Sequence, residues 1–297
     1  MTQRTSRILD KILVNERMNI PSLDFGSPGE SLVFLHANGY PPACYRPLLE
    51  LLGQDHHINA MVQRPLWPGS DPSKFTDWRR LTDDLLQFLA ARFSEPVLAV
   101  GHSMGGIALL RAALYWPERF KAIVLLDPVL FPRYMIVLWQ LMCSLGLGYR
   151  LHPLLVTTRR RRWQFDDLER LAHGYRRKAI FRYMDDRALK AYVEGISCER
   201  EDGGYELCYP IEWETRIYMT SIWSDLEIWR RLPALSVPAF FIRGEESKVF
   251  WASTAHRAER TQPGARLASL ACATHLVPLE RPQEVHALIH SFFKEVA

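Results

Sequence analysis

The sequence has few cysteines, and their arrangement argues against two kinds of structural site. No two of them are spaced Cys-x-x-Cys, the spacing typical of zinc sites, and an odd number argues against a disulfide framework. The 297 residues contain five, which are Cys44, Cys143, Cys198, Cys208 and Cys272. We therefore expect free thiols, no metal and a reducing compartment, which in practice means a cytoplasmic protein.

Apolar runs long enough to cross a membrane are also lacking. The apolar stretch Tyr134–Leu147 has about 14 residues, whereas a membrane-spanning helix needs roughly 20. Residues 1–17 mix charged side chains with apolar ones and offer no small-residue cleavage site, so they do not resemble a signal peptide. Neither region predicts a membrane span or an exported protein.

The charge and glycine patterns exclude further classes of ligand. The net charge is +4, and nearly all of it could come from the local run Arg159–Arg162, with no aromatic residues interleaved as in nucleic-acid-binding stripes. Phosphate-binding patterns such as Gly-Lys-Ser/Thr and Gly-x-Gly-x-x-Gly are absent. Hydrophobic residues at 48% and charged residues at 24% are ordinary for a globular protein. We expect neither a nucleic-acid partner nor a nucleotide cofactor.

What the sequence does contain is an alternation of strand and helix patterns. This alternation predicts an α/β fold with a mostly parallel central sheet and helices on both faces. Between residues 128 and 232 the strand patterns give way to helical ones, which predicts a helical cap (128–232) inserted between two parts of the core (1–127 and 233–297). The expected strands lie near residues 18–25, 31–36, 58–62, 97–100, 122–126, 239–244 and 266–270, and the expected cap helices at 166–184, 186–195 and 213–232.

One stretch carries the chemistry. The apolar run Val97–Val100 predicts a buried strand, and a helical pattern starts directly after Gly105, so the turn between them must be tight. In a Gly-x-Ser-x-Gly elbow the serine is strained with its hydroxyl projecting, and the glycines leave room for adjacent backbones. We therefore interpret Ser103, between Gly101 and Gly105, as a nucleophile.

A serine hydroxyl needs a base, and the chain order of such sites places that base late. His275 follows the last expected strand and is our candidate. His286 and His290 on the final helix and His256 on the helix before it are expected to be structural or surface residues. His102 is expected to be a packing residue, because its side chain must diverge from that of Ser103.

These motifs resemble, in matching order, the α/β-hydrolase superfamily, of the esterase/lipase type with a helical cap. The matching segments are His36–Gly39, Gly101–Gly105 and Thr274–His275. The resemblance implies an oxyanion hole formed by the backbone amide of Met104 and a second amide from the loop after an earlier strand. Asn38 matches that second position.

Two positions depart from the family pattern. His36-Ala37 replaces the common His-Gly, so either Ala37 or Asn38 could supply the second amide. The family usually carries its acid after the strand that here ends near Arg243, but no aspartate follows, and Lys248 stands about where many relatives have one. Our candidate acid is Asp127, which follows the strand at 122–126 and could alternatively be a helix N-cap.

Glu246 is the alternative acid, and a site without a working acid is the remaining possibility. A carboxylate beside His275 would hold the imidazole in the tautomer that catalysis needs.

Together these residues predict a serine hydrolase that cleaves a carboxylic ester of a lipid or medium acyl chain through an acyl-Ser103 intermediate, without a cofactor. A carbon–carbon hydrolase or a serine peroxidase would use the same triad. A non-catalytic protein that binds a small apolar ligand is the alternative of another class, and the missing aspartate at Lys248 is its main support.

The stretch 134–147 is expected to be a cap helix buried over an apolar ester pocket. The competing hypothesis is peripheral contact of this stretch and Arg159–Arg162 with an anionic membrane. The oligomeric state is left open by the sequence.

Overall fold

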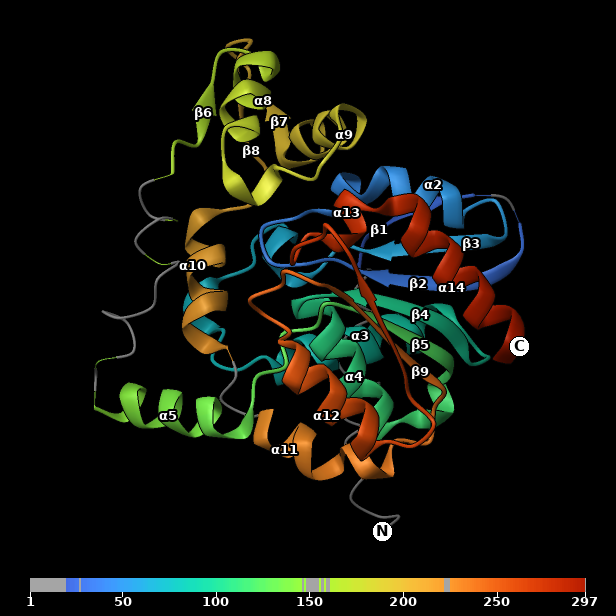
Figure 1. Ribbon diagram of the computed structural model, residues 1–297. Helices are drawn as coiled ribbons and strands as arrows, with labels where there is room; N and C mark the ends of the chain where they lie inside the picture. The colour runs from blue at the N-terminus through green and yellow to red at the C-terminus, as the bar shows by residue number, and fades with distance from the viewer. Residues whose placement is uncertain are drawn as a thin grey trace.

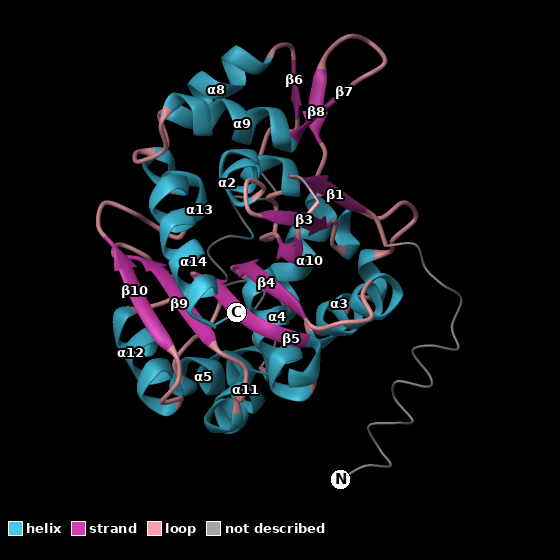
Figure 2. Cartoon of the chain, turned by 90° about the vertical axis from the view of Figure 1, so that its right-hand side faces the viewer, coloured by secondary structure: helices cyan, strands magenta, loops and turns pink. Residues whose placement is uncertain are grey.

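A seven-stranded sheet forms the centre of the computed structural model, which describes residues 20–26, 28–145, 147, 155, 158, 161–221 and 225–296. The strand order is β1-β3-β2-β4-β5-β9-β10, and every pair is parallel except β1 with β3 (Figures 1 and 2). The predicted mostly parallel sheet is therefore confirmed. The strands are β1 (Ser22–Phe25), β2 (Glu30–Leu35), β3 (His56–Met61), β4 (Val97–His102), β5 (Phe120–Leu126), β9 (Ala239–Gly244) and β10 (Arg266–Leu270).

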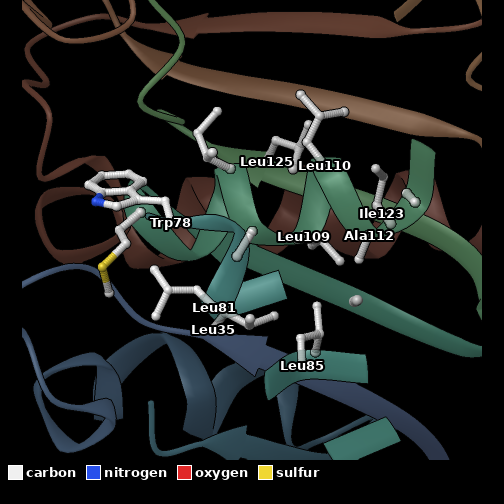
Figure 3. Packing of buried hydrophobic residues seen from close by; sticks show 14 of the residues in the cluster. Leu35, Trp78, Leu81, Leu85, Leu109, Leu110, Ala112, Ile123 and Leu125 are labelled. Carbon is white, nitrogen blue, oxygen red and sulfur yellow. The ribbon is translucent and has the colours of Figure 1, made fainter. Parts of the chain in front are cut away.

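Helices cover both faces of this sheet, because alternate residues of each strand point to opposite sides. Val33 and Leu35 of β2 join the core that contains α3, α4 and α12, whereas Leu32 and Phe34 join the core that contains α2 and α14. Figure 3 shows leucines of α3 and α4 packed near Leu35, Ile123 and Leu125 of the sheet. The helices are α2 (Arg46–Leu52), α3 (Arg79–Arg92), α4 (Met104–Tyr115), α12 (Ala252–Thr261), the short α13 (Val277–Glu280) and α14 (Pro282–Val296).

The chain between β5 and β9 contains the predicted helices and, in addition, a small sheet that the sequence did not predict. Three short strands pair antiparallel in the order β6-β8-β7. They were missed because two or three residues are too few for an alternating pattern. The expected helix at 166–184 ends at Arg176, and that at 213–232 is two helices. The elements are α5 (Arg133–Ser144), β6 (Gln164–Phe165), α8 (Leu168–Arg176), α9 (Asp186–Ile196), β7 (Ser197–Glu199), β8 (Tyr205–Leu207), α10 (Ile211–Thr220) and α11 (Asp225–Arg231).

This part of the chain is not all in one place. The helices α8 and α9 and the small sheet lie together near α2 and α13, at the top of Figure 1. In contrast, α11 packs against α4 and buries Ile228 and Trp229 in the core on that side of the central sheet.

The expectation that no disulfide forms is wrong. Cys198 and Cys208 are joined, with their Cα atoms 5.2 Å apart. The antiparallel pairing of β7 with β8 brings these ends together, since Ser197 lies opposite Leu207. Because β7 and β8 were not predicted, the sequence spacing of Cys198 and Cys208 did not indicate that they form a disulfide. Cys44, Cys143 and Cys272 are free thiols. The cytoplasmic location stays a prediction.

The helix α5 is not buried over a pocket, contrary to expectation. Ile136 is its one buried residue, whereas Tyr134 and Leu141 are 64% and 55% exposed. Periodicity showed the helix but could not show which surface its apolar side chains would meet. No helix in the described ranges is long and apolar enough to cross a bilayer. Arg159 and Arg160 lie outside the described residues, so peripheral membrane contact stays a prediction.

Candidate active site

Ser103 lies at the turn from β4 to α4 with a strained backbone. Its φ angle is 55°, in the left-handed region that side chains other than glycine rarely adopt. A Cβ atom on Gly101 would lie 2.7 Å from the carbonyl oxygen of Gly105, and one on Gly105 would lie 2.6 Å from that of Leu35. Both glycines are therefore required sterically, as the sequence pattern predicts for a serine elbow.

The structure brings Ser103, His275 and Asp127 together. His275, in the loop between β10 and α13, has its Nε2 atom 2.8 Å from Ser103 Oγ and its Nδ1 atom 2.7 Å from Asp127 Oδ1. Asp127 follows β5 directly and is fully buried. The helix α5 starts only at Arg133, so Asp127 does not cap it. The arrangement gives a hydroxyl, an imidazole and a carboxylate in one hydrogen-bonded row.

The loop after β9 holds Asp127 instead of supplying an acid. The Ser247 hydroxyl donates to Asp127 Oδ1 at 2.6 Å, and the Gly244 amide donates to Oδ2 at 3.0 Å. Glu246 is exposed and bonds with Arg182 and Tyr183, so the structure does not place it against His275. Lys248 is also exposed. Sequence reasoning missed Ser247, whose role depends on a contact across 120 residues.

The oxyanion loop, residues 36–40, follows β2. The amide of Ala37 donates to the hydroxyl of Tyr45 at 3.1 Å, so it is occupied and does not face a substrate. Among the hydrogen bonds of the described residues, none uses the amide of Asn38 or of Met104. These two amides therefore remain the candidate donors for a developing oxyanion.

The side chain of Asn38 fixes this loop to the chain between β5 and β9. Its Oδ1 atom accepts a hydrogen bond from the Tyr209 hydroxyl at 2.9 Å, and its Nδ2 atom donates to the carbonyl of Glu214 at 3.2 Å. Because both bonds are buried, they restrict the loop that carries the amide. The sequence indicated only the backbone of Asn38.

His102 is more than the packing residue we expected. The carbonyl of His275 can only accept, so His102 Nε2 donates to it at 2.8 Å, and Nδ1 of the neutral ring accepts from the Tyr45 hydroxyl at 2.7 Å, while that hydroxyl accepts from the Ala37 amide. Complete burial lowers the pKa of His102 well below its usual range, so the ring is neutral. This chain of bonds links the oxyanion loop to the backbone of the candidate base.

His36 anchors the start of the same loop in the neutral form. Its Nε2 atom accepts from the Gln63 amide at 3.0 Å, and its Nδ1 atom donates to the Ala37 carbonyl at 2.9 Å. Burial lowers the pKa of His36 to about 4. In the unfolded chain the pKa of His36 regains its usual value of about 6.5. Between pH 6.5 and pH 4 the unfolded state therefore binds a proton that the folded state does not.

A pH dependence of stability follows from His36. Between pH 7 and pH 4, the wild type should lose about 3 kcal/mol more of its free energy of unfolding than the His36→Gln variant, which has no proton to bind. Urea denaturation of both proteins at pH 7, 5.5 and 4 measures this difference. Comparison with the variant cancels the contributions of titratable groups that both proteins share. Equal losses of unfolding free energy in the two proteins would show that His36 does not have a lowered pKa in the folded state.

Three further histidines lie outside this site, as the sequence analysis predicts. His286 and His290 are on α14 and face Asp55, with His290 Nδ1 2.9 Å from Asp55 Oδ2. His256 lies on α12, 3.5 Å from Glu259.

A serine at a strained turn between a buried parallel strand and a helix, facing a histidine after the last strand, defines a hydrolase of the α/β class. The chain belongs to the alpha/beta hydrolase family, whose sequence model matches residues 32–288.

Known proteins agree with this assignment. The chain is 26% identical over 289 residues to the uncharacterized hydrolase YugF of Bacillus subtilis, covering 93% of this chain and 95% of the relative. The structure of E-2-(acetamidomethylene)succinate hydrolase superposes with a TM-score of 0.74 at 18% identity, over 94% of this chain and 97% of that one. A thermophilic esterase from Thermogutta terrifontis superposes with a TM-score of 0.66 at 16% identity, over 93% of each chain. These two structures show a shared fold.

Proposed function

We propose that this hydrolase cleaves a carboxylic ester through an acyl intermediate on Ser103. The observation that carries the proposal is the 2.8 Å contact between Ser103 Oγ and His275 Nε2, with Asp127 on the other imidazole nitrogen. A hydroxyl in this position can lose its proton to the ring as it attacks, which is the activation that a serine nucleophile requires.

The steps follow from the positions of these groups. Ser103 Oγ attacks the ester carbonyl carbon while its proton passes to His275 Nε2, and the oxyanion is stabilised by the amides of Asn38 and Met104. His275 then gives the proton to the leaving alcohol, which leaves an acyl-Ser103 ester. A water molecule attacks that ester with His275 again as base, and the proton returns to Ser103 as the carboxylic acid departs. The Asp127 carboxylate stabilises the imidazolium in both stages.

The alternative of a non-catalytic binding protein loses its main support. It depended on the missing aspartate at Lys248, but Lys248 is exposed and another aspartate, Asp127, lies beside His275. Two of the structurally similar proteins are esterases and one is an enol-lactonase, which supports an ester substrate.

The test is hydrolysis of p-nitrophenyl esters of increasing acyl length, combined with labelling by a fluorophosphonate. We expect turnover and a covalent adduct that mass spectrometry places on the peptide containing Ser103. Absence of turnover with every ester, together with an unlabelled Ser103, would refute the proposal.

A further inference from the structure

A groove of about 880 Å³ lies beside the oxyanion loop and has an unusual lining. It combines aromatic rings with an excess of positive charge, and Asp166 is the one carboxylate among the described residues that line it. The aromatic residues are Tyr40, Phe165, Tyr175, Phe181 and Tyr192, and the cationic ones are Arg161, Arg162, Arg170, Arg177 and Lys178.

Four of the rings pack against one another. Tyr192 lies at the centre, with ring centroids 5.4 Å from Tyr40, 5.2 Å from Tyr175 and 4.9 Å from Phe181. Burial raises the pKa of the Tyr192 hydroxyl, so this cluster adds no negative charge. The rings provide a surface for the apolar part of a ligand.

Several of the cations already have partners. Arg161 forms two hydrogen bonds of 3.0 Å with the buried Glu214 carboxylate. Arg162 and Arg170 share Asp166, at 3.8 and 3.6 Å. These contacts involve three of the five cations but supply only two negative charges.

The other two cations lack a carboxylate partner. Across the described residues no acidic group pairs with Arg177 or Lys178, and both are exposed. Lys178 Nζ lies 4.0 Å from the centroid of the Tyr175 ring, and partial burial, together with the nearby Arg161 guanidinium, lowers the pKa of this amine. An anion bound beside Lys178 would relieve the repulsion between Lys178 and Arg161.

The groove adjoins the oxyanion loop. Tyr40 stands two residues after Asn38 on this loop. Glu214, the partner of Arg161, has its carboxyl carbon 3.3 Å from where a Cβ on Gly39 would lie, and its carbonyl accepts from Asn38. Through Tyr40 and the Arg161–Glu214 pair, the groove therefore borders the loop that carries the Asn38 amide.

We propose that this groove binds an anionic group, a carboxylate or a phosphate, at the end of the substrate remote from the scissile ester. The aromatic cluster contacts the apolar part between them, and Lys178 and Arg177 attract the anion. This inference rests on the proposed ester hydrolysis and names its substrate class, which is esters that carry a negative charge.

The test compares esters that differ only in the charged group. In the acyl arm, mono-p-nitrophenyl adipate is compared with p-nitrophenyl hexanoate. In the alcohol arm, the butyrate esters of 4-hydroxybenzoate and of 4-hydroxyphenyl phosphate are compared with that of 4-cresol. We expect a higher kcat/KM for the charged member in at least one arm, carried mainly by KM because the contact is remote from the reacting bond. The arm that responds identifies the anion and its side of the ester.

Variants separate this site from general electrostatics. Lys178→Met should lower the ratio of kcat/KM for charged over neutral ester about threefold, and Lys178→Met with Arg177→Gln about tenfold, as expected for partly exposed charge pairs. Lys178→Arg keeps the charge and should preserve most of the ratio. Lys190→Met removes an exposed lysine of α9 outside the groove lining and should leave the ratio unchanged.

The possible failures are distinguishable. If neutral and charged esters are hydrolysed equally well in both arms, the anion site is refuted and the esterase proposal stands. The same holds if Lys178→Met and the double variant Lys178→Met, Arg177→Gln leave a preference for charged esters intact. If no ester is hydrolysed and Ser103 is not labelled, both proposals fall together.

Discussion

Replacing Ser103 with alanine is expected to lower kcat for ester hydrolysis about 10⁶-fold, to the residual rate that binding and oxyanion stabilisation alone provide. Alanine lacks the Oγ atom that lies 2.8 Å from His275 Nε2, so no acyl intermediate can form. The change removes one atom at a residue that is already strained at φ 55°, and alanine carries the same Cβ there, so we expect the fold to persist.

The measurement is the steady-state rate with p-nitrophenyl butyrate, with circular dichroism and thermal unfolding as checks on folding. Ser291→Ala is the matched control, since that serine lies exposed on α14 and bonds only with Glu295 on its own helix among the described contacts. Retention of more than about 1% of the wild-type rate by a folded Ser103→Ala protein would exclude Ser103 as the nucleophile, because loss of a triad nucleophile costs far more.

The features predicted from the sequence are those that strong local patterns specify. Buried parallel strands are continuously apolar, so β4 and β5 were recognisable without their neighbours. The elbow at Ser103 combines such a strand with two glycines and a following helix. Asp127 and His275 were candidates because each follows an expected strand, and carboxyl ends of parallel strands meet at one edge of the sheet.

The features that were missed depend on contacts between distant residues. Tyr45 and His102 are separated by 57 positions, and Ser247 meets Asp127 across 120. No local pattern distinguishes a tyrosine or serine that makes such a bond from one that faces solvent. The wrong prediction that α5 is buried has the same cause. The apolar content of a helix favours burial, but it does not specify which surface the helix packs against.

Replacing Asp127 with asparagine is expected to lower kcat about 10⁴-fold while leaving the fold intact, as a wrong imidazole tautomer does in a serine triad. The reason lies in the two groups that hold the carboxylate. The Gly244 amide can only donate, so the amide oxygen of an asparagine must take the Oδ2 position that faces it. Its NH₂ group then takes the Oδ1 position and faces His275 Nδ1, and the Ser247 hydroxyl, whose oxygen already accepts from the Val249 and Phe250 amides, loses the acceptor for its own proton.

In that arrangement His275 accepts a hydrogen bond at Nδ1 and carries its proton on Nε2, where it can no longer take the proton of Ser103. Glu246→Gln is the matched control for the competing acid, because it removes a carboxylate that bonds with Arg182 and Tyr183 at the surface. The rates of both variants with p-nitrophenyl butyrate decide the question. A folded Asp127→Asn protein within tenfold of wild type, or an equal loss in Glu246→Gln, would show that Asp127 does not orient the base.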